Sequence, residues 1–140
     1  MSKAVVVYWS GTGNTEAMAK AIEKGLKEGG AEVTLLETAQ AKADIIDQYD
    51  LFAFGCPAMG NEVLEEEAFE PFFTSIEGKL AGKKVALFGT YDWGDGQWMR
   101  DWQKRTADAG ATVFEEGFSV QQESSDEEAS AAFGKRFAAF

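Results

Sequence analysis

The most informative absence in this 140-residue sequence is that of histidine, of which the chain contains none. A histidine general base, a histidine metal site and a Ser-His triad are therefore excluded. The single cysteine, Cys56, excludes an internal disulfide, which fits a reducing cytoplasm. No apolar run approaches the roughly 18 residues of a membrane span, and no signal-peptide layout precedes the first apolar segment. We expect a cytoplasmic protein that does not enter a membrane.

Positive charge is the second shortage, since 13 Lys and Arg residues face 24 Asp and Glu residues, for a formal net charge of −11. The phosphates of a nucleic acid would be repelled, so we expect no nucleic-acid partner. A basic protein surface suits this chain better than an acidic one. The length and the 45% hydrophobic content fit one globular domain covering residues 1–140.

What the sequence does contain is an alternation of strand and helix patterns. Strands are predicted over Lys3–Trp9, Ala31–Glu37, Leu51–Cys56, Lys84–Gly89 and, with a weaker pattern, Thr112–Val120. A first helix is predicted by the spacing of Met18, Ala19, Ile22 and Leu26 and ends at Gly29-Gly30. Further helices are predicted over Asp44–Gln48, Glu65–Ile76 and Gln97–Ala109, and after a capping box at Ser125–Glu128. Pro71 weakens the helix predicted over Glu65–Ile76. Alternating elements with near-continuously apolar strands predict an α/β fold, a parallel sheet with helices on both faces.

Ligands of such sheets bind beyond the carboxyl ends of the strands. The unusual loops of this sequence stand at those ends. They are Ser10–Thr15 after the first strand, Pro57–Glu62 after the third and Thr90–Gly96 after the fourth. Three glycine-bearing loops are thus expected to meet at one edge of the sheet.

The first loop, SGTGNT, has the composition of an anion-binding turn. A dinucleotide fingerprint needs a third glycine or alanine where Glu16 stands, and a P-loop needs a lysine that the loop lacks. An anion must then be held by backbone N–H groups, the helix N-terminus and hydroxyl groups. This arrangement suits a terminal monophosphate held without metal; the alternative is a tight turn with a simple Ser or Thr cap.

Three segments, SGTGNT, CPAMGNE and GTYDWGDG, in this order and spacing, resemble the flavodoxins, specifically the short-chain type of anaerobic bacteria. The resemblance extends from the first strand to the last helix. It implies a flavodoxin-like three-layer sandwich with a five-stranded parallel sheet in the order 2-1-3-4-5. It also implies one non-covalent FMN and a role as a low-potential one-electron carrier between redox enzymes, cycling between semiquinone and hydroquinone. Reductases and other oxidoreductases would be its partners, and the chain would be a monomer.

The resemblance assigns cofactor contacts residue by residue. The FMN phosphate would be held by Ser10, Gly11, Thr12, Gly13, Asn14 and Thr15. The isoalloxazine would lie beside Ala58, Met59, Gly60, Asn61 and Glu62, and beside Thr90, Tyr91, Asp92, Trp93 and Gly94. Met59 would pack on its inner face and Trp93 on its outer face, while Glu62 would accept the flavin N3–H.

Redox tuning also follows from the resemblance. A peptide flip would turn the Gly60 carbonyl toward the flavin N5–H of the neutral semiquinone, which glycine permits because it tolerates positive φ. An anionic hydroquinone would be destabilised in an acidic site of low dielectric. Asp92 departs from the usual Tyr-Gly-Trp-Gly pattern. It is either a tolerated turn residue or a further repulsive charge, in which case Asp92→Gly raises the potential of the second couple.

Several other residues have two interpretations. Cys56 is expected to be a small buried side chain rather than a redox thiol, and Trp9 either walls the site or packs in the core. Trp98 and Trp102 are expected to pack a helix on the sheet. An acidic run could form a docking patch or a solvated helix face; it comprises Glu65, Glu66, Glu67 and Glu70.

Two other functions are compatible with parts of the pattern. A phosphorylation-dependent receiver domain has the same strand order. It needs an acidic cluster after the first strand and an aspartate ending the third, where this chain has Ser10-Gly11 and Cys56-Pro57. A small FMN-dependent NAD(P)H or quinone reductase is the stronger alternative, but it needs access to the flavin face that Trp93 would cover.

Overall fold

The computed structural model of the chain describes all residues except 1, 12, 60–62, 92–95 and 122–125. A parallel sheet forms its middle layer, with the strand order β2-β1-β3-β4-β5 and with β6 also paired to β4. The strands are β1 (Lys3–Tyr8), β2 (Glu32–Glu37), β3 (Leu51–Gly55), β4 (Lys84–Tyr91), β5 (Thr112–Val113) and β6 (Phe118–Gln121). The predicted α/β class and strand order are confirmed.

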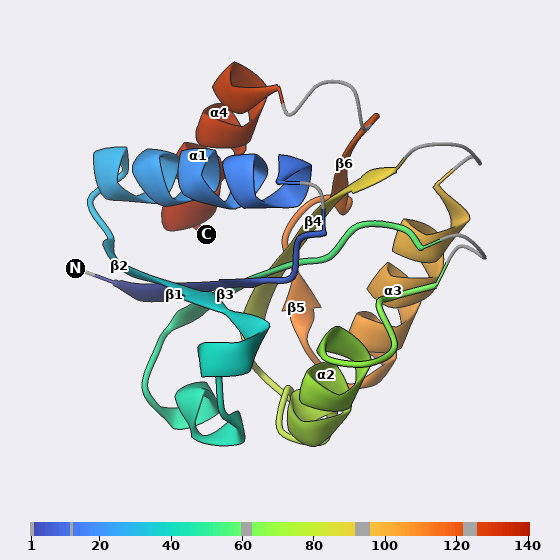
Figure 1. Ribbon diagram of the computed structural model, residues 1–140. Coiled ribbons are helices and arrows are strands. Elements are labelled where there is room, and N and C mark those ends of the chain that lie inside the picture. The colour runs from blue at the N-terminus through green and yellow to red at the C-terminus, as the bar shows by residue number, and fades with distance from the viewer. Residues whose placement is uncertain (1, 12, 60–62, 92–95, 122–125) are drawn as a thin grey trace.

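Helices cover both faces of this sheet (Figure 1). α1 (Asn14–Glu28) and α4 (Glu127–Ala138) lie on one face, and α2 (Phe69–Glu77) and α3 (Gln97–Asp108) lie on the other. Two short 3₁₀ helices, η1 (Thr38–Gln40) and η2 (Ala43–Asp47), follow β2; the second corresponds to the helix predicted at Asp44–Gln48.

The two-residue period of the strands creates two separate cores. Along β1, Val5 and Val7 belong to the apolar cluster beneath α2 and α3, whereas Ala4 and Val6 belong to the cluster beneath α1 and α4. All four side chains are fully buried, as expected for a strand covered on both faces. Trp98 and Trp102 of α3 are also buried in the first cluster, which confirms their predicted packing role.

The fifth predicted strand differs from the structure, because Thr112–Val120 is interrupted. β5 and β6 both pair in parallel with β4, but the segment between them leaves the ladder. Glu115 has a φ of 50°, a conformation incompatible with a strand. Next to it, the N–H of Gly117 donates to the side chain of Gln103 at 2.8 Å instead of to a neighbouring strand. The break is set by these local conformations, which a hydropathy pattern does not encode.

Two helix starts also differ from prediction. The last helix has Asp126 as its N-cap, with the carboxylate accepting the N–H of Ala129 at 3.2 Å, so a cap at Ser125 is wrong. Ser125 itself lies outside the described residues. The third predicted helix begins at Phe69 rather than Glu65, which places Pro71 in the first turn, where its missing N–H is tolerated.

None of the helices in the described part of the chain has the length and apolarity that crossing a bilayer requires.

Candidate functional site

The first loop joins the end of β1 to the start of α1. The chain leaves the sheet after the N–H of Trp9 donates to the carbonyl of Gly55 at 3.0 Å. Gly13, with a φ of 98°, is the N-cap of α1, and its N–H donates to the Ser10 hydroxyl at 3.0 Å. A Cβ at Gly13 would meet open space, so glycine is required there by conformation and not by crowding. The loop therefore presents the N-terminus of a 15-residue helix at the carboxyl edge of the sheet.

A buried pair of hydroxyl groups connects this loop to β4. The Oγ1 atoms of Thr15 and Thr90 are 3.1 Å apart, and both residues are buried. One hydroxyl hydrogen is used in this contact, so the second hydroxyl hydrogen remains available to an additional acceptor. Together with the helix N-terminus, the pair supplies donors but no formal charge, which suits a phosphate group held without a cation.

The second loop continues from β3 along the same edge. The N–H groups of Cys56 and Ala58 donate to the carbonyls of Phe88 and Thr90, at 3.1 and 2.9 Å, and so prolong the pairing with β4. The N–H of Met59 then donates to the carbonyl of Val63 at 3.0 Å. Ala58 and Met59 are half-buried, a degree of exposure that leaves part of each side chain available to a ligand.

The third loop follows β4, whose last residue, Tyr91, is half-buried with its ring 5.9 Å from the ring of Trp98, measured between centroids. The structure thus brings the described members of the predicted site to one edge, at the ends of three adjacent strands. These members are Ser10, Gly11, Gly13, Asn14, Thr15, Ala58, Met59, Thr90 and Tyr91. The others lie outside the described residues; they are Thr12, Gly60, Asn61, Glu62, Asp92, Trp93 and Gly94.

Trp9 and Cys56 lie beside these loops. Trp9 is half-buried against the core cluster beneath α2 and α3, and its ring is close enough that a Cβ on Gly11 would lie 3.1 Å from it. Trp9 therefore both packs in the core and borders the first loop. Burial raises the pKa of the Cys56 thiol to about 12, so the thiol stays protonated at neutral pH. This agrees with the interpretation of Cys56 as a small buried side chain.

Sequence analysis missed the hydrogen bonding of Tyr8, at the end of β1. Its hydroxyl donates to Glu16 at 3.1 Å and lies 3.4 Å from a carboxylate oxygen of Glu37. Burial and the two carboxylates raise the pKa of Tyr8 to about 12. The pairing connects β1, β2 and the first turn of α1 next to the first loop. No local motif could have revealed it, because the three residues meet only in the folded sheet.

The acidic run at the start of α2 does not form one patch. Glu65 is buried, with 6% of its surface exposed, and Glu70 is bound by Arg105 of α3. Glu66 and Glu67 are exposed. The prediction of a docking patch or solvated face is therefore wrong for Glu65, because this carboxylate is turned inward to backbone N–H groups.

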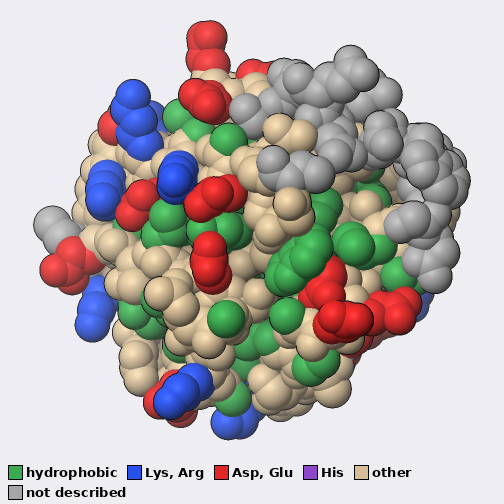
Figure 2. Space-filling model, viewed as in Figure 1, with side chains coloured by type: hydrophobic (Ala, Val, Ile, Leu, Met, Phe, Trp, Pro, Cys, Tyr) green, Lys and Arg blue, Asp and Glu red, His purple; other side chains and the backbone are tan. Residues whose placement is uncertain are grey.

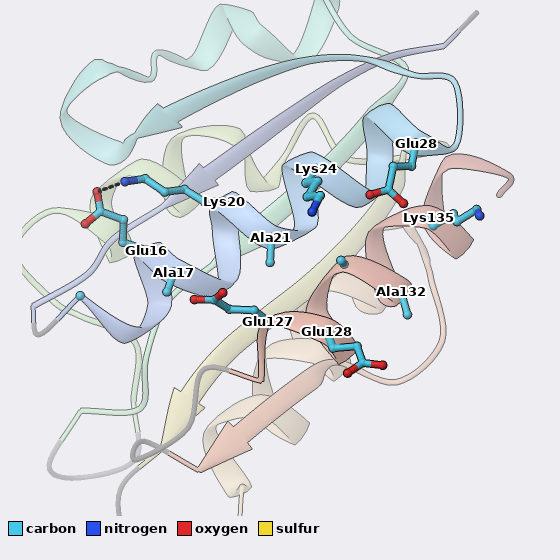
Figure 3. Close-up of a pocket in the computed structure, with 12 residues that line it drawn as sticks. Glu16, Ala17, Lys20, Ala21, Lys24, Glu28, Glu127, Glu128, Ala132 and Lys135 are labelled. Atoms are coloured by element: carbon cyan, nitrogen blue, oxygen red, sulfur yellow. Dashed lines mark ion pairs between the residues drawn. The ribbon is translucent and has the colours of Figure 1, made fainter.

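A hollow lies along the outer surface between α1 and α4 and reaches Gly13 at the start of α1 (Figure 3). Its volume is about 830 Å³, and its floor includes Ala17, Ala21 and Ala132. Lysines and glutamates stand along its walls, with Glu16 and Lys20 paired at 3.6 Å. None of its described lining residues is aromatic, so the groove has nothing on which a planar ring would stack. Within the described ranges, no group of three or more acidic or Cys side chains is placed to hold a metal ion.

Three loops at the carboxyl edge of a doubly covered parallel sheet, the first of them a glycine-bearing turn without lysine at a helix N-terminus, define an α/β protein of the flavodoxin-like class. The sequence model of the flavodoxin family matches residues 6–134, and the chain belongs to this family. A flavodoxin of Clostridium beijerinckii is 48% identical over 134 residues, which are 95% of this chain and 97% of that protein. The flavodoxin of Megasphaera elsdenii is 54% identical over 108 residues, 77% of this chain and 79% of that protein.

The fold comparison agrees with the sequence comparison. The solution structure of two-electron reduced Megasphaera elsdenii flavodoxin superposes with a TM-score of 0.89 at 46% identity, covering 98% of this chain and 99% of that one. As a flavodoxin, the chain binds FMN and is an electron-transfer protein that serves redox partner proteins, rather than an enzyme. The reductase alternative is not favoured.

Proposed function

We propose that FMN binds at the carboxyl edge of the sheet, with its phosphate in the turn before α1 and its ring between the second and third loops. The observation that carries this proposal is the turn itself, in which a helix N-terminus, the left-handed Gly13 and the buried Thr15–Thr90 pair converge. The phosphate ligands would be Ser10, Gly11, Thr12, Gly13, Asn14 and Thr15. The ring contacts would be Ala58, Met59, Gly60, Asn61, Glu62, Thr90, Tyr91, Asp92, Trp93 and Gly94.

The residues of this site fit the cofactor chemically. A dianionic phosphate suits N–H and hydroxyl donors at a helix start, and a half-buried thioether such as Met59 suits an aromatic ring. FMN supplies the ability to accept and release single electrons. The chain would orient the ring, shield part of it from water and surround it with acidic residues, which disfavours added negative charge and so keeps the reduction potential low.

We further propose that partners dock with a basic surface near this edge and that the carrier is a cytoplasmic monomer of one domain. Figure 2 shows acidic side chains gathered near the start of α2, whereas most Lys and Arg side chains in that view lie over α1 and at the lower edge. Exposed Glu66 and Glu67 belong to this acidic side, and Val63 beside them is 37% exposed. An apolar residue next to carboxylates suits a transient contact with a basic redox protein.

The phosphate assignment can be tested with two ligands, FMN and riboflavin, which differ in the phosphate alone. Ser10→Ala should weaken FMN binding by about ten- to hundredfold, because a hydrogen bond to a charged group is lost, and should leave riboflavin binding unchanged. Ser75→Ala is the matched control, since the Ser75 hydroxyl donates to the carbonyl of Phe72 within α2. An equal loss for both flavins would refute the phosphate contact.

A further inference from the structure

Glu65 satisfies the backbone donors at the start of α2 almost by itself. Its carboxylate accepts the N–H groups of Glu67, Ala68 and Phe69 at 2.7 to 2.8 Å. Its own carbonyl accepts the N–H of Glu70 at 2.8 Å, and Pro71 has no N–H to satisfy. The helix start therefore depends on one side chain that stands three residues before the N-cap, Ala68.

Glu65 is also fixed to the end of β3. Its N–H donates to the sulfur of Cys56 at 3.4 Å. The carbonyl of Cys56 in turn accepts the indole N–H of Trp98 at 3.2 Å, and the N–H of Cys56 donates to Phe88. The chain thus passes from Cys56 into the second loop and returns at Glu65 to contact Cys56 again, where both residues are buried.

The buried Glu65 carboxyl group is charged at neutral pH. Burial raises its pKa, but the N–H groups of Phe69, Ala68 and Glu67 outweigh burial and leave the pKa below the usual glutamate value. A charged acceptor makes stronger hydrogen bonds than a neutral one. The three bonds therefore form a rigid anchor at the returning end of the loop.

We propose that Glu65 is a positioning residue for the flavin ring: it holds Val63 and Leu64, and through the Met59–Val63 hydrogen bond it holds Met59 in place. This proposal rests on the proposed function, in which Met59 contacts the isoalloxazine. In the described part of the loop, the contacts between the anchor and Met59 are short and sequential: Glu65 is two residues from Val63, whose carbonyl accepts the Met59 N–H at 3.0 Å. If the anchor is loosened, the loop that would contact the flavin ring is displaced.

The alternative is that Glu65 acts by charge alone, and the two roles predict opposite results. Removing a negative charge would tighten binding of the anionic FMN and leave neutral riboflavin unaffected. Losing the anchor would weaken both flavins by the same factor, because the ring that they share is contacted less well. Glu65→Gln removes the charge and one acceptor, whereas Glu65→Asp retains the charge but shortens the reach to the N–H groups.

The experiment measures FMN and riboflavin dissociation constants for both variants, with Glu66→Gln as the matched control for charge on an exposed neighbour. We expect Glu65→Asp and Glu65→Gln to weaken both flavins about tenfold, and Glu66→Gln to leave riboflavin binding unchanged. Amide hydrogen exchange in the apoprotein provides a readout without flavin: in Glu65→Asp, exchange at Met59 and Phe69 should accelerate about tenfold, while exchange in β1 stays unchanged.

Glu65→Asp is the deciding variant if Glu65→Gln does not fold. Riboflavin binding by Glu65→Asp equal to that of the unaltered chain would overturn the proposal, as would FMN binding that tightens in Glu65→Gln. Failure of the proposed function is a separate result: equal loss of both flavins in Ser10→Ala.

Discussion

Thr15 and Thr90 stand 75 positions apart, yet their buried hydroxyl groups meet between the first turn of α1 and β4. Neither residue was connected to the other by the sequence pattern, although each was assigned to the site separately. The hydroxyl pair orients Thr15 relative to the helix N-terminus. The same contact thus contributes to the stability of the carboxyl edge of the sheet and, in the proposed function, to the binding of FMN.

Thr90→Val tests this coupling, because valine has nearly the same shape as threonine but lacks the hydroxyl group. The Thr15 hydroxyl would lose its buried partner, so we expect a loss of about 1–3 kcal/mol in the free energy of unfolding of the apoprotein, measured with urea. FMN should bind less tightly than to the unaltered chain, because Thr15 is no longer oriented. Thr112→Val, at an exposed position of β5, is the control and should change neither quantity. Unchanged stability in Thr90→Val would show that the hydroxyl contact contributes nothing.

At the scale of elements, α2 and α3 are joined by Arg105. Its guanidinium group donates to both oxygens of Glu70 and to both oxygens of Glu77, at 2.7 to 2.9 Å, and it stacks 4.9 Å from the ring of Phe73. The Arg105 hydrogen bonds lower the pKa of Glu70 despite its partial burial. A carboxyl group with a lowered folded-state pKa stabilises the fold above its unfolded pKa, and this contribution is lost as the pH falls through the folded value.

Arg105→Met should therefore destabilise the chain in a pH-dependent manner. We expect a loss of about 1–2 kcal/mol at pH 7, since the network is bidentate but partly exposed. The difference from the unaltered chain should shrink as the pH falls through the lowered pKa of Glu70, because protonation removes the charge that Arg105 binds. Urea unfolding at a series of pH values measures it. Lys104→Met removes a fully exposed ion pair with Asp108 and should leave stability unchanged; a loss for Arg105→Met that is independent of pH would contradict the ionic account.

The close contact between α1 and α4 requires glycine at two positions. A Cβ on Gly134 would overlap the backbone carbonyl of Ile22, and one on Gly25 would overlap that of Ala131. The two helices therefore approach more closely than side chains permit. This close approach also forms the floor of the outer groove between them.

Gly134→Ala should cost at least about 2 kcal/mol of unfolding free energy, because the added methyl group meets backbone that cannot rotate away. Gly78→Ala is the matched control: a Cβ there meets nothing within 4 Å and its φ is −72°. Gly78 follows α2, so alanine should be neutral or slightly stabilising there. Thermal unfolding of both variants decides the matter, and equal midpoints would be inconsistent with close helix contact.

The elements show which features a sequence can predict. Buried strands such as Leu51–Cys56 were found because a strand covered on both faces needs a continuous apolar run. The break at Glu115 and the late start of α2 were missed, since both depend on partners distant in space or on a side chain bonded to its own backbone. For the site, the motifs predicted the edge and the described residues there. They did not predict the inward turn of Glu65, which looks like any exposed glutamate in a run of charges.

At the scale of the whole molecule, the net charge of −11 is the property that acts on an approaching partner at the longest range. If docking uses a basic partner surface, electron transfer to a basic haem protein should slow as salt is added, with the steepest change at low ionic strength. Stopped-flow oxidation of the reduced chain between about 0.01 and 0.5 M ionic strength measures this. A neutral acceptor of similar potential is the control. A rate that is independent of salt for both acceptors would contradict electrostatic docking.

The central claim is that one chain holds one FMN and exchanges electrons singly. An anaerobic spectroelectrochemical titration of the FMN-loaded chain tests it most directly. We predict two resolved one-electron steps, the second at a more negative potential because charge is added to an acidic, partly dry site. The same preparation should oxidise neither NADH nor NADPH at a steady rate without a partner protein. A single two-electron step, or rapid unaided oxidation of either nicotinamide, would contradict the account.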